Sequence, residues 1–188
     1  MKKFLILILT LAMMSVSVVG LTSCEFVDRF LPKESEEIIE SDSTNEEENA
    51  GEGLRYVLSE EGKYYSVTDI GGYTDTELVI SSMYQGLPVE KIEAYAFYNC
   101  IALTSVTILD GVTKIGGLAF AGCSGLTSVV IPKSVMRIGG SAFRWCNRLE
   151  SITFEGTVAE WNAMSKGDAW NYRIKAKKVI CADGIASL

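Results

Sequence analysis

Apolar residues recur every 23 positions through the middle of this chain, and the polar residues between them vary. Eight columns of similar residues result when the sequence is written in rows of that length. They are Val89, Val112 and Val135; Ile92, Ile115 and Ile138; Ala96, Ala119 and Ala142; Phe97, Phe120 and Phe143; Cys100, Cys123 and Cys146; Leu103, Leu126 and Leu149; Val106, Val129 and Ile152; Ile108, Ile131 and Phe154. This periodicity is typical of a solenoid, in which each coil buries its apolar side chains only when a neighbouring coil covers them.

Each row also predicts its own elements. The stretches LTSVTI (103–108) and LTSVVI (126–131) alternate apolar and polar residues, which favours a short strand with one face inward. VTKIG (112–116) indicates a second short extended piece, and GGLAFAGC (116–123) a tight helical turn. The predicted fold is therefore an α/β solenoid, a short stack of 23-residue coils made of short strands and helical turns.

The rows resemble the BspA-like class of bacterial leucine-rich repeats, whose rows read roughly LTSVTIPxSVTSIGxxAFxxC. The resemblance covers residues 76–154. It implies a surface protein whose repeats act in protein interaction or adhesion. The partner would be a protein or glycan on a host, on a neighbouring cell or on the protein's own envelope. The first row has five extra residues between Ile80 and Val89, and Gly86 and Pro88 indicate a longer loop there.

Both ends of the stack have sequences suited to covering it. Residues 54–75 form the predicted N-terminal cap, with a β-hairpin over 54–70. Its apolar side chains would cover the first coil; these are Tyr56, Leu58, Tyr65 and Val67.

Residues 155–188 form the predicted C-terminal helix/strand cap. Thr157 and Glu160 make a capping box, which predicts a helix over 158–165 that stops near Gly167. We expect Trp161 and Trp170 to close the last coil, and KKVICADG (177–184) to be a final strand.

The first 53 residues have a different character. A basic start and a long apolar stretch end in LTSC, which resembles the lipobox of bacterial lipoproteins. The resemblance implies that residues 1–23 are a signal peptide and that Cys24 carries a covalent lipid, the one cofactor-like group expected. The protein would then be lipid-anchored on the outer face of the membrane. Residues 24–53 follow as an acidic tether, predicted to be disordered, which holds the chain's net negative charge.

Residue chemistry argues against catalysis. The chain has no histidine, so a serine or cysteine nucleophile lacks its usual base, and no C-x-x-C motif suggests a metal site. We expect no enzyme activity, metal, small-molecule substrate or nucleic-acid partner. Stacked cysteines suit a crowded apolar corner as thiols, and a disulfide between neighbours is the alternative. The sequence leaves the redox state of Cys100, Cys123, Cys146 and Cys181 open.

Three groups of exposed residues are candidates for binding, and the sequence does not choose among them. The candidates are a strand face of Ser105, Thr107, Leu109, Ser128, Val130, Ser151 and Thr153; a basic ladder of Lys91, Lys114 and Arg137; and an aromatic group of Tyr95, Tyr98 and Trp145. One alternative function is glycan binding through the basic ladder or through Trp145, Trp161 and Trp170. Another is a structural envelope component without a foreign ligand.

Overall fold

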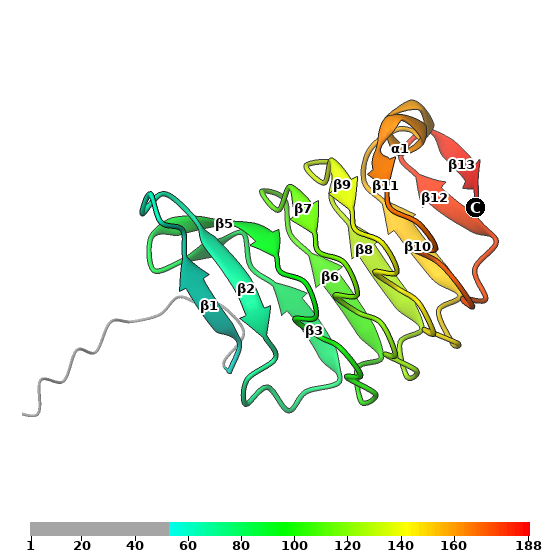
Figure 1. Cartoon of the computed structure of the whole chain (residues 1–188). Helices are drawn as coiled ribbons and strands as arrows, with labels where there is room; N and C mark the ends of the chain where they lie inside the picture. The colour runs from blue at the N-terminus through cyan, green and yellow to red at the C-terminus, as the bar shows by residue number, and fades with distance from the viewer. Residues whose placement is uncertain (1–52) are drawn as a thin grey trace, which may run out of the picture. The chain divides into compact units, whose positions relative to one another are not determined.

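The computed structural model describes residues 53–188 (Figure 1). The predicted signal peptide, the lipidation site Cys24 and the acidic tether up to residue 52 lie outside the described residues.

The described residues form a solenoid whose coils each add one strand to each of two sheets (Figure 1). The first sheet consists of β3 (Glu77–Ile80), β6 (Ser105–Ile108), β8 (Ser128–Ile131), β10 (Ser151–Phe154), β12 (Lys178–Cys181) and β13 (Gly184–Ser187). The second consists of β1 (Arg55–Leu58), β2 (Tyr65–Asp69), β5 (Leu87–Ile92), β7 (Lys114–Ile115), β9 (Arg137–Ile138) and β11 (Ser165–Lys166), with β4 (Met83–Tyr84) paired to β5. Strands of successive coils pair in parallel, as the predicted solenoid requires.

The repeated apolar columns form one continuous core between the sheets. Phe97, Phe120 and Phe143 are fully buried and lie in single file. The ring of Phe120 is 5.0 Å from that of Phe97 and 5.2 Å from that of Phe143, with interplanar angles of 7° and 5°. The prediction that equal positions of successive rows are neighbours in space is confirmed.

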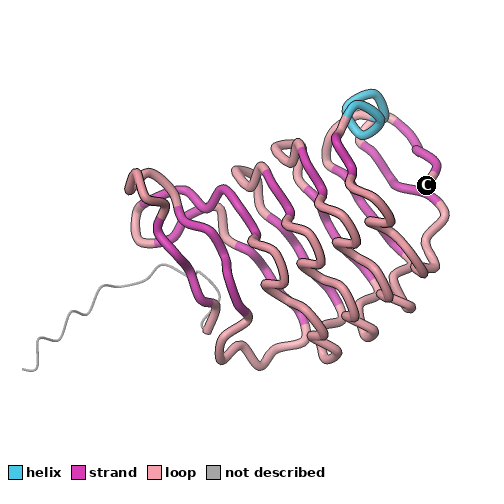
Figure 2. The backbone as a smooth tube through the Cα atoms, in the orientation of Figure 1, coloured by secondary structure: helices cyan, strands magenta, loops and turns pink. Residues whose placement is uncertain are grey.

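The predicted helical turns are absent from these coils, and the α/β description is wrong in that respect. The structure has turns there (Figure 2), because two residues per row adopt a left-handed backbone, and the first of these positions already ends any helix. This position holds Tyr95, Leu118, Ser141 and Ala169, with φ between 51° and 65°. Alternate N–H groups then donate to the next coil, as from Phe97 to Ala119 O and from Phe120 to Ala142 O, both at 2.8 Å.

The N-terminal hairpin is present, as β1 and β2 paired antiparallel. β2 then pairs in parallel with β5, so the hairpin covers the first coil by extending the second sheet. Val67 is fully buried, and Tyr56 and Tyr65 pack against the core. Leu58 is predicted to join them but is exposed, because it lies beside the turn at Ser59, at the tip of the hairpin.

The extra residues of the first row form a second hairpin, where the sequence predicts a loop. β4 and β5 are joined through Gln85 and Gly86, whose φ values of 47° and 76° are those of a two-residue hairpin turn. Tyr84 of this hairpin stacks on Tyr56 with ring centroids 3.9 Å apart. The insertion therefore packs against the N-terminal hairpin.

At the other end, the stack continues through β11 and β12, which pair in parallel with β9 and β10. The predicted final strand is present as β12, but the chain then turns back and adds β13 antiparallel to it. β13 is not predictable from its sequence, because the pattern GIAS is short and weakly apolar.

A single α-helix, α1 (Val158–Ala163), occurs in the described residues, and it packs against β13. It ends earlier than the predicted 158–165, because Ser165 and Lys166 pair with β9 as a strand. Lys166 lies level with Ile138 and donates to the carbonyls of Trp161 and, at 3.1 Å, Met164, which supplies a C-terminal cap to α1. Within residues 53–188 we find no helix that combines the length and hydrophobicity needed to span a bilayer.

The capping box at the start of α1 is confirmed, and it predicts a pH effect. Thr157 N donates to the Glu160 carboxylate at 2.7 Å, and Glu160 N donates to the Thr157 hydroxyl at 3.2 Å. Backbone and side-chain hydrogen bonds from Thr157 lower the pKa of Glu160. A carboxylate with a depressed folded-state pKa stabilises the fold above its ordinary pKa of 4.5, and this contribution disappears as the pH falls through the folded value.

We therefore expect Glu160→Gln to lower the melting temperature at neutral pH. Below about pH 4 the same substitution should lower it by less. Thermal unfolding followed by circular dichroism between about pH 3 and pH 7 measures this. Glu155→Gln, which changes an exposed carboxylate outside the box, is the control. If the melting temperatures of Glu160→Gln and the parent differ by the same amount at every pH in this range, the stabilising role assigned to the ionised Glu160 is contradicted.

Candidate functional site

The strand-face candidates lie on the outer side of the first sheet in two rows that cross the coils. Ser105, Ser128 and Ser151 form one row, level with Glu77 of β3. The other row consists of β-branched residues, with valine and threonine alternating before a final isoleucine: Val79, Thr107, Val130, Thr153 and Ile180. Except for Glu77, Val79 and Ile180 at the ends of the rows, these side chains are half-buried by their neighbours, and Leu109 is more exposed. The result is a largely neutral face of hydroxyl and aliphatic groups.

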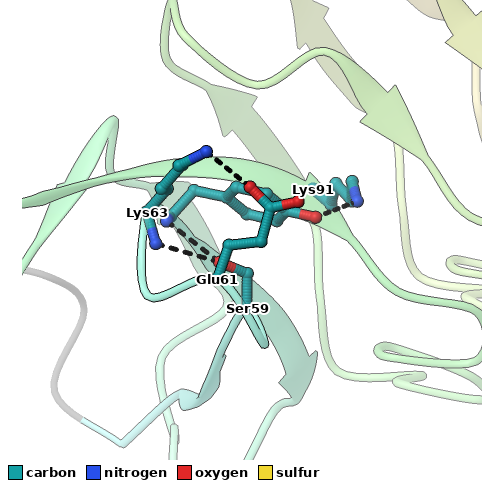
Figure 3. A network of polar contacts seen from close by, with 5 residues as sticks. Ser59, Glu61, Lys63 and Lys91 are labelled. Carbon is teal, nitrogen blue, oxygen red and sulfur yellow. Dashed lines mark hydrogen bonds and ion pairs between the residues drawn. The ribbon is translucent and has the colours of Figure 1, made fainter.

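The basic ladder is also assembled as predicted, on the second sheet. Lys91, Lys114 and Arg137 lie level with one another on β5, β7 and β9. Lys91 is already engaged, since its ammonium donates to the Tyr64 hydroxyl and lies 4.4 Å from the centre of that ring (Figure 3). The hydrogen bond to Tyr64 raises the pKa of Lys91. Two of the three cations therefore remain for an external ligand.

The aromatic candidates lie at the turns that join the second sheet to the first. Tyr95 and Tyr98 are half-exposed and contact each other edge to face, with ring centroids 5.9 Å apart. Trp145 lies two coils further along with a left-handed φ of 66° and 40% of its surface exposed. Of the three, Tyr98 and Trp145 line one hollow and Tyr95 lies outside its lining.

This hollow, which we call the turn-face hollow, exists because the coil between its walls carries small residues. Its lining residues are Tyr98, Asn99, Leu118, Ala121, Gly122, Ser124, Arg144, Trp145 and Asn147. Asn99 N donates to Ala121 O, and Gly122 N donates to Arg144 O, which places the three coils side by side. The first coil contributes Tyr98 and Asn99, the next Ala121 and Gly122, and the third Arg144 and Trp145. Successive coils lie about 4.8 Å apart, so the walls stand about 10 Å from each other.

Two arginines and a second aromatic ring build the wall around Trp145. Arg173 Cζ lies 4.6 Å and Arg144 Cζ 5.7 Å from the centre of the Trp145 ring. Tyr172 meets Trp145 edge to face at 6.3 Å, and the same two guanidinium groups lie 5.7 Å and 5.3 Å from its ring centre. A hydrogen bond from Arg173, together with its charge, lowers the pKa of the Tyr172 hydroxyl. The wall is aromatic and positively charged.

Sequence reasoning missed Tyr172 and Arg173 as parts of this surface. They occupy the same two columns as Arg144 and Trp145, because Trp145 N donates to Tyr172 O at 2.9 Å. The spacing is 28 residues where earlier rows have 23, since the coil also contains α1. A signal was available in GDAWNYR (167–173), which resembles GGSAFRW (139–145).

The alternative of a sugar-binding platform on three tryptophans is wrong for two of them. Trp161 is 1% exposed and Trp170 is 8% exposed. Their rings contact each other at 5.8 Å, and Trp161 also packs on Phe154. They close the last coil, as predicted, and offer no surface to a ligand.

The stacked cysteines are free thiols in the structure, as is Cys181. Cys123 Sγ donates to Phe97 O and Cys146 Sγ to Phe120 O, each at 3.1 Å, so these thiols bind the backbone of the preceding coil. The hydrogen bond with Cys100 lowers the pKa of Cys123, but the bond with Cys146 and burial outweigh it and raise the pKa to about 12. A thiol that stays protonated is a poor nucleophile. The column therefore has a structural role.

Comparisons with known proteins agree with this architecture. Residues 76–165 match the family described as "BspA type Leucine rich repeat region (6 copies)". No curated protein matches the chain significantly.

Similar solved structures come from several bacteria. A leucine-rich repeat protein of Bacteroides capillosus ATCC 29799 is 25% identical, with a TM-score of 0.57 over 72% of this chain and 97% of that one. A leucine rich cell surface protein of Faecalibacterium prausnitzii A2-165 is 27% identical, with a TM-score of 0.51 over 75% of this chain and only 44% of that one. The T. pallidum leucine-rich repeat protein TpLRR is 22% identical and shares the fold, with a TM-score of 0.58 over 70% of each chain.

The periodic core, the parallel stacking of coils and the family match lead to one conclusion: residues 76–165 of this chain are a BspA-type leucine-rich repeat region.

Proposed function

We propose that this chain is a bacterial surface lipoprotein whose leucine-rich repeat region acts as a protein-interaction or adhesion module. The lipid on Cys24 would anchor it to the outer face of the membrane, and the acidic tether would separate the repeats from the bilayer. The partner would be a protein on a host, a neighbouring cell or the protein's own envelope.

The observation that carries this proposal is the turn-face hollow. The solenoid repeats the same buried residues in every coil, yet tryptophan, tyrosine and arginine gather at one exposed corner. These are the residue types that dominate binding energy at protein interfaces. Surface location is supported by the LTSC sequence that ends at Cys24 and by the similar cell surface protein of F. prausnitzii.

The strand face is less suited to act alone. Four coils present roughly 400 Å² of sheet, and a standard interface buries about 800 Å² on each partner. Tight binding through this face alone would need many anchored copies on one polymeric ligand. The hollow offers a more specific contact in a smaller area.

One cell-binding experiment tests anchoring and recognition separately. The full chain is produced in a bacterial host, and the cells are tested for adhesion to immobilised matrix proteins, mucin and envelope extract. We expect adhesion to at least one surface. Cys24→Ala should release the protein from the membrane fraction and abolish adhesion, whereas Trp145→Ala should leave it anchored and still abolish adhesion.

Two controls accompany these variants. Cys100→Ala removes a different cysteine and should leave the anchor intact. Met136→Ala removes an exposed apolar side chain away from the hollow and should leave adhesion intact. If the anchored parent chain gives no adhesion to any surface, the proposal fails and the structural envelope role is favoured.

A further inference from the structure

The turn-face hollow has one arginine in its lining, Arg144, and a second, Arg173, lies against the Trp145 ring of its wall. In residues 53–188, the ion pairs are Glu61–Lys63 and Glu150–Lys175, so no carboxylate pairs with Arg144 or Arg173 there. The residues that line the hollow include no aspartate or glutamate. A hollow with one cation in its lining, a second beside its wall and no acidic lining residue favours an anionic ligand.

The arginines are held by aromatic rings, and Arg173 also donates a hydrogen bond to the Tyr172 hydroxyl. A guanidinium group that stacks on a ring uses its flat face and keeps its N–H edge free for a carboxylate. The Nε of Arg144 is buried without a hydrogen-bond partner among the described residues, so a carboxylate in the hollow would meet the terminal Nη groups of this guanidinium. Packing against Trp145 and Tyr172 therefore orients Arg144 before any ligand binds.

The same rings argue against a neutral sugar as the ligand. With two guanidinium groups over the indole of Trp145, the ring is not a free stacking surface. Asn99 and Asn147 also line the hollow, and their side-chain amides can pair with peptide N–H and C=O groups. The hollow measures about 500 Å³, which accommodates a few residues of an extended peptide.

We propose that the turn-face hollow binds an acidic peptide segment of a partner protein, whose carboxylates are held by Arg144 and Arg173. This inference rests on the proposed function and adds the chemistry of the ligand to it. Bidentate arginine–carboxylate pairs combine charge with directed hydrogen bonds, and these pairs give the site its preference for glutamate or aspartate. The basic ladder is the less favourable site, since two of its three members are lysines, which lack the fork geometry of arginine.

The test uses the full chain in detergent and a fluorescent eight-residue peptide of alternating glutamate and glycine. Fluorescence anisotropy at about 50 mM salt measures the dissociation constant. We expect saturable binding that weakens about tenfold in Arg173→Gln and no more than about twofold in Arg137→Gln. Both variants remove one exposed arginine, Arg173 beside the Trp145 wall of the hollow and Arg137 in the ladder. Both variants keep the acidic segment that precedes residue 53, so they differ only in which arginine is removed.

A second variant tests the shape of the hollow without changing its charge. Gly122 forms its floor with φ 79°, and a Cβ there would meet the Asn99 amide. Asparagine tolerates this backbone, as Asn99 itself does at φ 58°. Gly122→Asn should therefore still unfold cooperatively, with a melting temperature lowered by the strain at this φ and by the displacement of the Asn99 side chain, and it should lose peptide binding.

Three results would overturn the inference. If Arg137→Gln and Arg173→Gln weakened peptide binding equally, the binding would be an unspecific attraction between charges. Binding of a uronate oligosaccharide, with the same dependence on Arg173 and without peptide binding, would make the ligand an acidic glycan. Absence of peptide binding while Trp145-dependent cell adhesion persists would refute the acidic ligand and leave the proposed function standing.

Discussion

Replacing Gly139 with alanine is expected to destabilise the solenoid by about 3 kcal/mol, a large loss for the addition of a single methyl group. A Cβ at this position would lie 2.4 Å from Gly117 N and 2.6 Å from Gly116 C, which are backbone atoms of the preceding coil. Gly116 and Gly167 have equally close contacts with their own preceding coils. Glycine here lets two backbones approach each other, so a side chain must push two coils apart.

The adjacent glycine provides a matched control. A Cβ on Gly140 would have Asp168 O as its nearest neighbour, at 3.4 Å, which is ordinary van der Waals contact. Gly140→Ala should therefore change the free energy of unfolding by no more than about 0.5 kcal/mol. Urea unfolding followed by circular dichroism compares the two variants. Equal losses would show that the close approach at Gly139 does not limit the stacking of coils.

The stack of coils could be predicted because its determinants are buried side chains that repeat in sequence. Phe97, Phe120 and Phe143 are identical residues at equal intervals. An arrangement in which they share one water-free core buries all three. The glycine pairs that begin at Gly116 and Gly139 also repeat, but the sequence does not tell which glycine of each pair meets backbone. That distinction depends on distances between coils.

The errors in the predicted fold have a common physical origin. The turn at 116–123 has a helical pattern in its sequence, but every second N–H group finds its partner in the next coil, as between Phe120 and Ala142. Bonds of this kind leave no local signal. β11 likewise ends α1 early, because pairing with β9 prevails over the helical tendency of the residues beyond Ala163.

Half of the candidate site was predictable for a similar reason. Tyr98 and Trp145 stand out in the sequence as variable residues of regular rows, and the structure places both at the turn-face hollow. Tyr172 and Arg173 escape such reasoning because α1 lengthens their row and hides its register. The hollow itself also depends on Ala121 and Gly122. These small residues leave a space only because the coils on either side carry the larger Tyr98 and Trp145.

Phe120→Ala should cost about 3–5 kcal/mol, the loss expected when a buried phenylalanine leaves a cavity. Phe120 has no exposed surface and is stacked between two nearly parallel rings, so its removal takes contacts from the coils on both sides. The backbone around it cannot collapse easily, because Phe120 N donates to Ala142 O and Phe120 O accepts from Cys146 Sγ.

Two further variants separate the size of the side chain from its ring. Phe120→Leu should retain most of the stability, with a loss of about 1.5 kcal/mol, because leucine fills most of the space. Tyr95→Ala removes an aromatic ring that is 59% exposed and should cost about 0.5 kcal/mol. Urea unfolding gives all three values. Since each coil is stabilised mainly by its nearest neighbours, a loss for Phe120→Ala as small as that for Tyr95→Ala would mean that the phenylalanine column does not hold the coils together.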